Sequence, residues 1–186
     1  RAASEQRARA ELEEAERLRL EAEAARLAAE AKDLENYRSE FFGRLRQVLA
    51  GREGVRIEGD RFVFSSEVLF EPASADLSPS GEEQIANVVS ILRDVSGEIP
   101  SEIDWIIRVD GHTDKVPLSG TGRYRDNWEL SQGRALSVVR YMTDALGFDP
   151  SRLAATGFGE YRPAVAGDTP EAYAQNRRIE LKLTER

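Results

Sequence analysis

The sequence predicts an α/β protein in which a two-layer domain, a mixed sheet with helices on one face, follows one long N-terminal helix. Three observations support this fold class. Residues 1–50 consist mostly of strong helix formers, residues 51–186 alternate strand-like and helix-like apolar patterns, and glycine and proline separate these segments. Alternating strands and helices favour helices packed on a sheet. We therefore expect a helix over residues 1–50 and one domain over residues 51–186.

The N-terminal segment has the composition of a continuous helix. Residues 1–50 are rich in Ala, Glu, Arg and Leu, contain no proline, and have their first glycine at Gly43. These residue types have high helix propensity. At ~1.5 Å per residue an unbroken helix would be on the order of 75 Å long. Gly51 and Gly54 are expected to end it.

An apolar residue recurs every seven positions in this helix. The series is Leu20, Leu27, Leu34, Phe41 and Val48, with Ala24, Ala31 and Leu45 in a partial second stripe. A sustained seven-residue repeat flanked by charges favours a coiled coil, and therefore a homodimer through the N-terminal helix. The alternative is a single helix packed on its own domain through Tyr37, Phe41, Phe42, Leu45 and Val48. The sequence leaves both arrangements open.

The first half of the domain is expected to contain a hairpin and a helix. Apolar residues alternate over residues 55–64 around a Gly59-Asp60 turn, which is typical of a β-hairpin, and a short apolar stretch follows at 68–70. Ser78-Pro79, with Ser80 and Glu83 as a capping pair, predicts a helix start. The apolar face of that helix is formed by Ile85, Val88, Val89 and Leu92.

The second half repeats the strand–helix alternation to the end of the chain. A strand over residues 105–109 leads into a polar loop that lasts to about residue 126. A helix with apolar residues at 135, 138, 139, 142 and 146 ends at Gly147, and strand-like residues 153–158 follow. Thr169-Pro170-Glu171 starts a short helix before a last strand with Ile179, Leu181 and Leu183.

Composition excludes several classes of function. The formal net charge is −8, from 26 basic and 34 acidic side chains, which argues against nucleic acid as a partner. The chain has no cysteine, so disulfides, thiolate catalysis and zinc–sulfur sites are excluded. No apolar run approaches the about 20 residues that span a bilayer. Because the first residue is Arg1 rather than methionine, we expect that a targeting or membrane segment has been removed.

Polar residues cluster where the expected strands and helices begin or end, which is where a scaffold presents binding groups. Four clusters occur in order along the chain: Gly111-His112-Thr113-Asp114, then Asn127-x-x-Leu130-Ser131-x-x-Arg134-Ala135, then Gly157-x-Gly159-Glu160-x-x-Pro163, and finally Asn176-Arg177-Arg178-Ile179-Glu180. The four ordered motifs resemble those of the OmpA-like peptidoglycan-binding domain family over roughly residues 55–185. The long insertion at 115–128, and the helix that leads directly into the domain, are most similar to the MotB branch of flagellar stator proteins.

The resemblance implies non-catalytic binding of peptidoglycan through its stem peptide, in particular the side-chain end of diaminopimelate. That end is a zwitterion, for which the family's positions supply Asp114 to the ammonium and Arg134 to the carboxylate. A planar guanidinium suits a carboxylate because it donates two parallel hydrogen bonds. Thr113, Asn127 and Leu130 are implied as pocket residues. A second cation is expected from Arg178, or else Arg177.

The resemblance further implies a periplasmic protein that anchors a membrane or motor protein to the cell wall. No cofactor, metal or catalytic residue is expected. Attachment to the inner membrane would use a segment absent from this chain. An alternative form of the same function is the periplasmic half of a flagellar stator subunit.

Three other interpretations of these residues remain. Asp114 and Arg134 would form only a structural ion pair. His112, the one histidine, would act with Asp110 or Asp114 in a wall hydrolase or bind a cation. The globular end would dock another protein and bind no cell wall. Trp105 and Trp128 are expected in the core or in a pocket wall.

Overall fold

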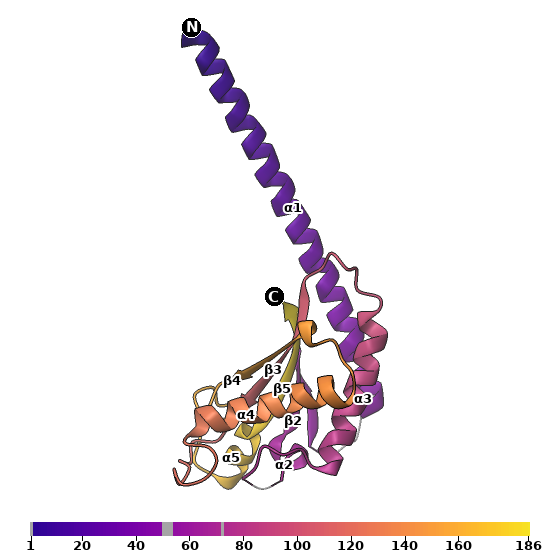
Figure 1. Cartoon of the computed structure of the whole chain (residues 1–186), viewed down its shortest axis with the longest axis vertical. Coiled ribbons are helices and arrows are strands. Elements are labelled where there is room, and N and C mark those ends of the chain that lie inside the picture. The colour runs from indigo at the N-terminus through magenta and orange to yellow at the C-terminus, as the bar shows by residue number, and fades with distance from the viewer. Residues whose placement is uncertain (1, 50–53, 72) are drawn as a thin grey trace.

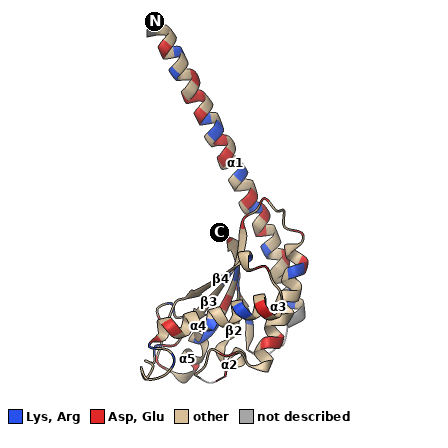
Figure 2. Ribbon diagram, viewed as in Figure 1, with Lys and Arg blue, Asp and Glu red and all other residues tan. Residues whose placement is uncertain are grey.

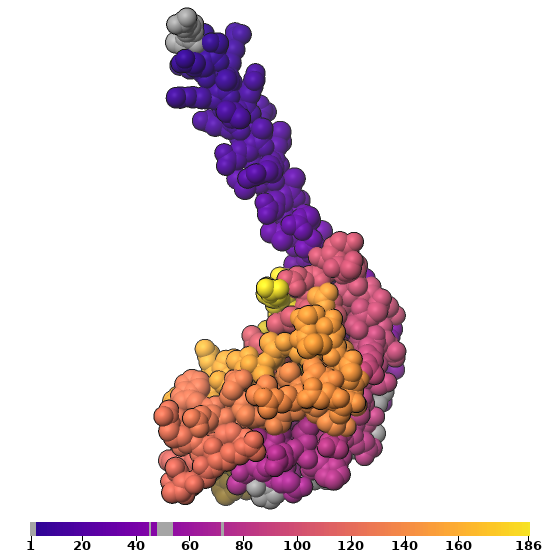
Figure 3. Space-filling model, in the orientation of Figure 1, coloured from indigo at the N-terminus to yellow at the C-terminus, as the bar shows by residue number. Residues whose placement is uncertain are grey.

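The computed structural model describes residues 2–49, 54–71 and 73–186. It consists of a long helix, α1 (Ala2–Leu49), and an α/β domain at its C-terminal end (Figure 1). The N-terminal part of α1 stands clear of the domain (Figure 3). None of the helices in the described ranges carries an apolar stretch able to cross a membrane.

Helix α1 has two parts with different surroundings. Leu20 and Leu27 are 53% and 52% exposed, whereas Leu34 and Phe41 are 0% and 1% exposed and belong to the core of the domain. Acidic and basic residues are interspersed along the projecting part (Figure 2). Pairs such as Arg26–Glu30, at 2.7 Å, support the helix at i,i+4 spacing. Two later members of the seven-residue series therefore pack on the chain's own domain, whereas Leu20 and Leu27 do not. The side chains of Leu45 and Val48, and all of Gly51, lie outside the described residues.

The domain is built on a mixed sheet, as the sequence predicts, and this sheet has five strands. Its strands are β1 (Val55–Glu58), β2 (Arg61–Ser65), β3 (Trp105–His112), β4 (Leu153–Gly157) and β5 (Arg178–Glu185), in the order β1-β2-β5-β3-β4. All neighbouring pairs are antiparallel except β3 and β4. In the β3–β5 pair, His112 lies opposite Arg178, so the end of β3 and the beginning of β5 meet at one edge of the sheet.

The remaining elements are helical. They are α2 (Ser66–Leu69), α3 (Pro79–Ser96), α4 (Asn127–Arg140), which a π turn η1 (Tyr141–Ala145) continues, the 3-10 turn η2 (Pro150–Arg152) and α5 (Pro170–Asn176).

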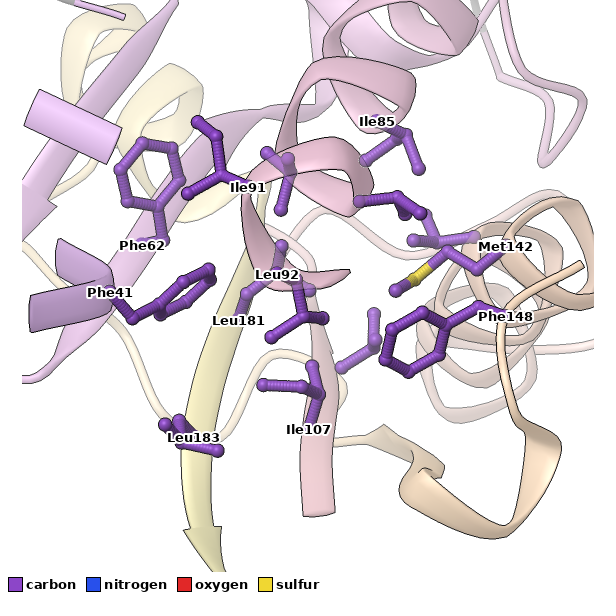
Figure 4. Packing of buried hydrophobic residues seen from close by; sticks show 14 of the residues in the cluster. Phe41, Phe62, Ile85, Ile91, Leu92, Ile107, Met142, Phe148, Leu181 and Leu183 are labelled. Atoms are coloured by element: carbon purple, nitrogen blue, oxygen red, sulfur yellow. The ribbon is translucent and has the colours of Figure 1, made fainter. Parts of the chain in front are cut away.

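One face of the sheet forms the core with α1, α3 and α4. Alternate residues of β2, β3 and β5, such as Phe62, Ile107 and Leu181, are at most 1% exposed and pack against Leu92 of α3 and Met142 of η1 (Figure 4). The prediction of helices on one face is therefore confirmed. Burial of this face fixes the register of each strand, because a slip by one residue would turn its apolar side chains to the other face.

The opposite face of the sheet is polar. Asp110, Glu180 and Arg178 are at most 4% exposed and lie on this face because they alternate with the core residues. Arg108 donates two hydrogen bonds to Asp110, at 2.8 and 2.9 Å, and Arg178 donates one to Glu180 at 2.8 Å. Buried charges on this face are therefore paired, as burial requires.

The predicted capping pair of α3 was wrong. The helix begins at Pro79, and the side chain of Ser78 accepts the hydrogen bond from the Gly81 N–H, at 3.0 Å. Ser80 consequently lies inside the first turn. The Ser78 hydroxyl also donates to the carbonyl of Val68, at 2.8 Å, which joins the start of α3 to α2.

Candidate ligand-binding site

Polar clusters that are far apart in the sequence meet at the edge of the sheet where β3 ends. Thr113 and Asp114 follow β3 directly, Asn127 is the first residue of α4, and Arg177 immediately precedes β5. The pairing of His112 with Arg178 brings the first and last of these clusters together. Helix α4 approaches this edge closely, since a Cβ on Gly111 would lie 2.1 Å from the carbonyl oxygen of Ser131.

Asp114 is held by the chain that surrounds it. Its Oδ2 accepts a hydrogen bond from Arg177 Nη1 at 2.7 Å, and its Oδ1 accepts one from the Val116 N–H at 3.0 Å. Arg177 also pairs with Glu67 of α2. Burial lowers the pKa of Arg177, but its hydrogen bonds to Asp114 and Glu67 outweigh burial and hold that pKa above the usual value. The result is a chain of alternating charges from α2 to the loop after β3.

Arg134 is a buried cation of a different kind. It is 6% exposed, its Nε donates to the carbonyl of Ser74 at 2.9 Å, and its guanidinium lies 5.2 Å from the centre of the Phe70 ring. None of the residues that the structure describes forms a salt bridge with it. Burial, followed by the positive charge of Arg177, lowers its pKa, and Asp114 opposes that shift only in part. A guanidinium in this state is stabilised by any anion that reaches it.

Arg134 and Arg177 face a common cavity of about 340 Å³. The cavity lies between α2, the turn after it and α4, and its lining residues are Ser66, Glu67, Phe70, Glu71, Ala73, Arg134 and Arg177. Two guanidiniums and two carboxylates therefore surround one small space with an aromatic wall. Its volume is within the range of roughly 300–1,000 Å³ typical of small-ligand sites. Such a site suits a ligand that carries both charges.

Other residues of the first two motifs position this site rather than line the cavity. The Asn127 side chain donates to the carbonyls of Asp114 and Val116, at 3.2 and 3.1 Å, which fixes the loop after β3. The Thr113 hydroxyl donates to the Asp114 carbonyl at 2.8 Å, and the Thr113 N–H donates to the carbonyl of Gly159 at 2.9 Å. Leu130 is 6% exposed and anchors the first turn of α4.

Arg178 lies apart from the cavity that Arg134 and Arg177 line. Its Nε binds Glu180, and its other N–H groups donate to the carbonyls of Asn176 and Arg162, at 3.2 and 2.9 Å. The reason is strand alternation: Ile179 points into the core, so Arg178 and Glu180 point to the polar face. Of the two arginines, it is Arg177 that lies beside Asp114. Which of them contacts a ligand stays a prediction.

His112 is enclosed on the polar face. It is 2% exposed, its ring stacks on Phe158 with centroids 4.9 Å apart, and its Nε2 lies 3.5 Å from Glu180. Burial raises the pKa of Glu180, but the nearby His112 and the hydrogen bonds from Arg178 and Arg61 outweigh burial and hold that pKa well below its usual range. In this arrangement His112 contacts structural charges and is closed to a substrate. The described residues contain no group of three side chains suited to hold a metal ion.

The comparison with family models decides the relationship. The model of the OmpA family matches residues 69–177, more than half of the chain. The chain belongs to the OmpA family. The matched segment includes every cavity residue except Ser66 and Glu67.

Relatives of this OmpA-family chain include cell-envelope proteins. The peptidoglycan-associated lipoprotein of Pseudomonas aeruginosa is 34% identical over 113 residues, which are 61% of this chain and 59% of that protein. A putative MotB-like protein from Desulfovibrio vulgaris has a similar structure, with a TM-score of 0.71 and 29% identity over 84% of this chain and 96% of that one.

A second solved structure is the cell wall anchor of the T6SS from Pseudomonas aeruginosa, with a TM-score of 0.65 and 26% identity over 77% of this chain and 96% of that one. The resemblance to the OmpA family and its MotB-like members is thus confirmed. The chain spans about half the length of the curated relatives it matches.

One wall of the cavity in this OmpA-family domain is formed by residues that carry no sequence motif. Glu67, Phe70 and Glu71 come from α2 and the turn after it, and no motif pointed to them. The only local signal was a short apolar stretch between two glutamates. Its relation to Arg134 depends on the packing of α2 against α3 and on the contacts of the following turn with Arg134, which a local sequence pattern does not contain.

Proposed function

We propose that this OmpA-family domain binds peptidoglycan without catalysis and anchors a membrane or motor-associated protein to the cell wall. The observation that carries the proposal is Arg134, a buried guanidinium without a salt-bridge partner among the described residues, beside the Asp114–Arg177 pair. The names of the lipoprotein and of the cell wall anchor, given above, support the same ligand.

The proposed ligand group is the side-chain end of diaminopimelate in the stem peptide. Its carboxylate would lie between Arg134 and Arg177, where it relieves the repulsion that lowers the pKa of Arg134. Its ammonium would approach Asp114 and Glu67, the two carboxylates that Arg177 already contacts. A zwitterion therefore matches the cavity better than a simple anion, which would leave the acidic groups without a new partner. Thr113, Asn127 and Leu130 hold the site in shape.

A single stem peptide should bind weakly. Charge-assisted hydrogen bonds contribute about 1.5–3 kcal/mol each, and loss of rigid-body freedom opposes them by at least several kcal/mol. Two domains on one dimer would bind a polymer far more tightly, because the second contact is intramolecular. The exposed Leu20 and Leu27 of α1 offer a seam for such a homodimer.

The alternative form of this function is the periplasmic half of a flagellar stator subunit. The structural similarity to a MotB-like protein favours it. In both forms the protein would work in the periplasm, and in the stator form a segment outside this chain would attach it to the inner membrane. The full-length gene distinguishes them: a membrane helix with an acidic residue indicates a stator, and a lipidation signal indicates an outer-membrane anchor.

Co-sedimentation with purified diaminopimelate-type sacculi tests the binding proposal. The wild-type chain should pellet with sacculi, and Arg134→Ala or Asp114→Ala should remain in the supernatant with an unchanged circular dichroism spectrum. Arg93→Ala and Asp94→Ala are matched controls, since they remove the same side chains from the exposed surface of α3. Arg134→Lys keeps the charge but loses the two-pronged geometry, and we expect intermediate binding.

Two outcomes would contradict the proposal. Full retention of sacculus binding by both site variants would remove the site and favour docking through another surface. Release of soluble muropeptides during incubation would indicate a hydrolase.

A further inference from the structure

A second hollow runs along the outer side of α4. It has a volume of about 620 Å³, and its lining includes Tyr124, Trp128, Gln132, Leu136 and Arg140. Three of these residues, Trp128, Gln132 and Leu136, follow each other at i,i+4 spacing, so they form one stripe of the helix. We call this hollow the α4 groove. It is open, elongated and bordered by both apolar and polar side chains.

Two exposed aromatic side chains lie at one end of the α4 groove. Trp128 is 50% exposed and Tyr161 is 59% exposed, and their rings stack with centroids 4.9 Å apart and an angle of 28° between the planes. Gly159 has a φ of +60°, and a Cβ added there would lie 3.4–3.5 Å from both rings, so the turn after β4 is closely fitted to the pair. Two large aromatic rings packed together at the surface form a contiguous apolar patch, a feature that interaction sites share.

The α4 groove and the charged cavity lie beside the same turn of α4, because Gly133 lines the groove and Arg134 lines the cavity. The ring of Tyr124 lies against the backbone of α4, since a Cβ on Gly133 would be 2.7–2.9 Å from its atoms. Tyr124 also lines the groove and is near enough to Arg134 to influence its pKa. One elongated polymer can therefore contact both places, with its charged branch at Arg134 and its main chain along the groove.

We propose that the α4 groove binds the glycan strand of the same polymer, with an N-acetylated sugar ring stacked on the Trp128–Tyr161 platform. This inference rests on the proposed function and adds a second contact to it. A sugar ring presents C–H groups on its faces and hydroxyls at its rim, so an aromatic face and polar neighbours match both. Gln132, Glu129 and Arg140 supply hydrogen-bonding groups around the platform. The lining carries two arginines, Arg123 and Arg140, against one glutamate, Glu129, so its net charge is only +1, which is compatible with a largely neutral saccharide.

The test uses the full chain and a β-1,4-linked N-acetylglucosamine tetramer, which carries no peptide. The chain contains two tryptophans, so the NMR spectrum has two indole N–H signals. Trp105 is 4% exposed and serves as the internal reference. We expect the tetramer to shift the Trp128 signal and to leave the Trp105 signal in place.

Variants then assign the contact. Trp128→Ala and Tyr161→Ala should each weaken tetramer binding about tenfold, on the order of one aromatic stacking contact. Tyr161→Phe keeps the ring and should bind like the wild type. Leu18→Ala is the matched control, because Leu18 is 54% exposed but lies on the projecting part of α1.

The two proposals fail in different ways. Arg134→Ala should lose sacculi but still bind the tetramer, and if it does not, the two contacts are not separate sites. The glycan contact would be overturned if the tetramer did not shift the Trp128 signal, or if both alanine variants bound the tetramer as the wild type does. Either result would count irrespective of the sacculus binding. Weaker sacculus binding by Trp128→Ala without any tetramer binding would assign the platform to a peptide or protein instead, and would also overturn it.

Discussion

Leu27 and Leu34 occupy equivalent positions of the seven-residue repeat in α1, but their surroundings differ. Leu27 is 52% exposed and Leu34 is 0% exposed. A Leu→Ala substitution changes the helix propensity equally at both positions, so that term cancels in the comparison. The difference in the free energy of unfolding therefore measures what each side chain packs against.

Truncation of a fully buried leucine costs about 2–5 kcal/mol. For a chain of this size about 1 kcal/mol shifts the Tm by roughly 2–4 °C, so Leu34→Ala should lower the Tm of the domain by about 4–20 °C. Truncation of an exposed leucine stays within about 0.5 kcal/mol. Leu27→Ala should therefore unfold like the wild type when the protein is dilute.

The assay is thermal unfolding followed by the fluorescence of the two tryptophans, which report on the domain and not on the tip of α1. Measurements at low and at high protein concentration distinguish packing within one chain from dimerisation, since a dimer is stabilised by mass action. A destabilising effect of Leu27→Ala at high concentration only would indicate a coiled coil. Equal effects of both substitutions at every concentration would refute the docking of residues 34–42 on the core.

Three further predictions follow from single contacts. Glu180 has a depressed pKa in the folded chain, so it stabilises the fold above its unfolded pKa of about 4.3, and this contribution is lost as the pH falls. Glu180→Gln should therefore flatten the acid branch of a curve of unfolding free energy against pH. An unchanged slope would contradict this. Gly111→Ala should destabilise strongly in urea unfolding because its Cβ would clash with the backbone of α4, whereas Gly43→Ala, which meets no atom within 4 Å, should stabilise α1 by about 1 kcal/mol. Ser78→Ala should lower the free energy of unfolding by about 1 kcal/mol, because it removes the N-cap of α3, and Ser80→Ala, its matched control, should lower it little. A larger loss for Ser80→Ala than for Ser78→Ala would support the cap that the sequence predicted.

Much of the fold could be predicted because it depends on local periodicity. Alternating apolar residues in the hairpin at 55–64 and in the strand with Ile179 marked one buried face of a sheet, and the spacing of the helical segments marked their core sides. The predicted cap of α3 was wrong because Ser78 and Ser80 are both acceptable cap residues. Ser78, which is the N-cap in the structure, also makes a second hydrogen bond, to the carbonyl of Val68 in α2.

The candidate site was predictable only in part. The family motifs predicted that Asp114 and Arg134 lie close together, and in the structure both are close to Arg177 at one edge of the sheet. The wall formed by α2 carried no motif. Strand alternation before Ile179 could have placed Arg178 on the polar face, because Ile179, Leu181 and Leu183 already defined the core side.

The sequence by itself determined the two-part organisation, the strand and helix faces and the motifs of the OmpA family, since these follow from propensity, periodicity and residue order. Only the tertiary structure decided which charged groups share a cavity and which half of the α1 repeat is buried. The physical reason is that both depend on distances between segments far apart in the chain, such as Glu67 and Arg177 or Phe41 and the sheet. Those distances are set by how the segments pack against one another.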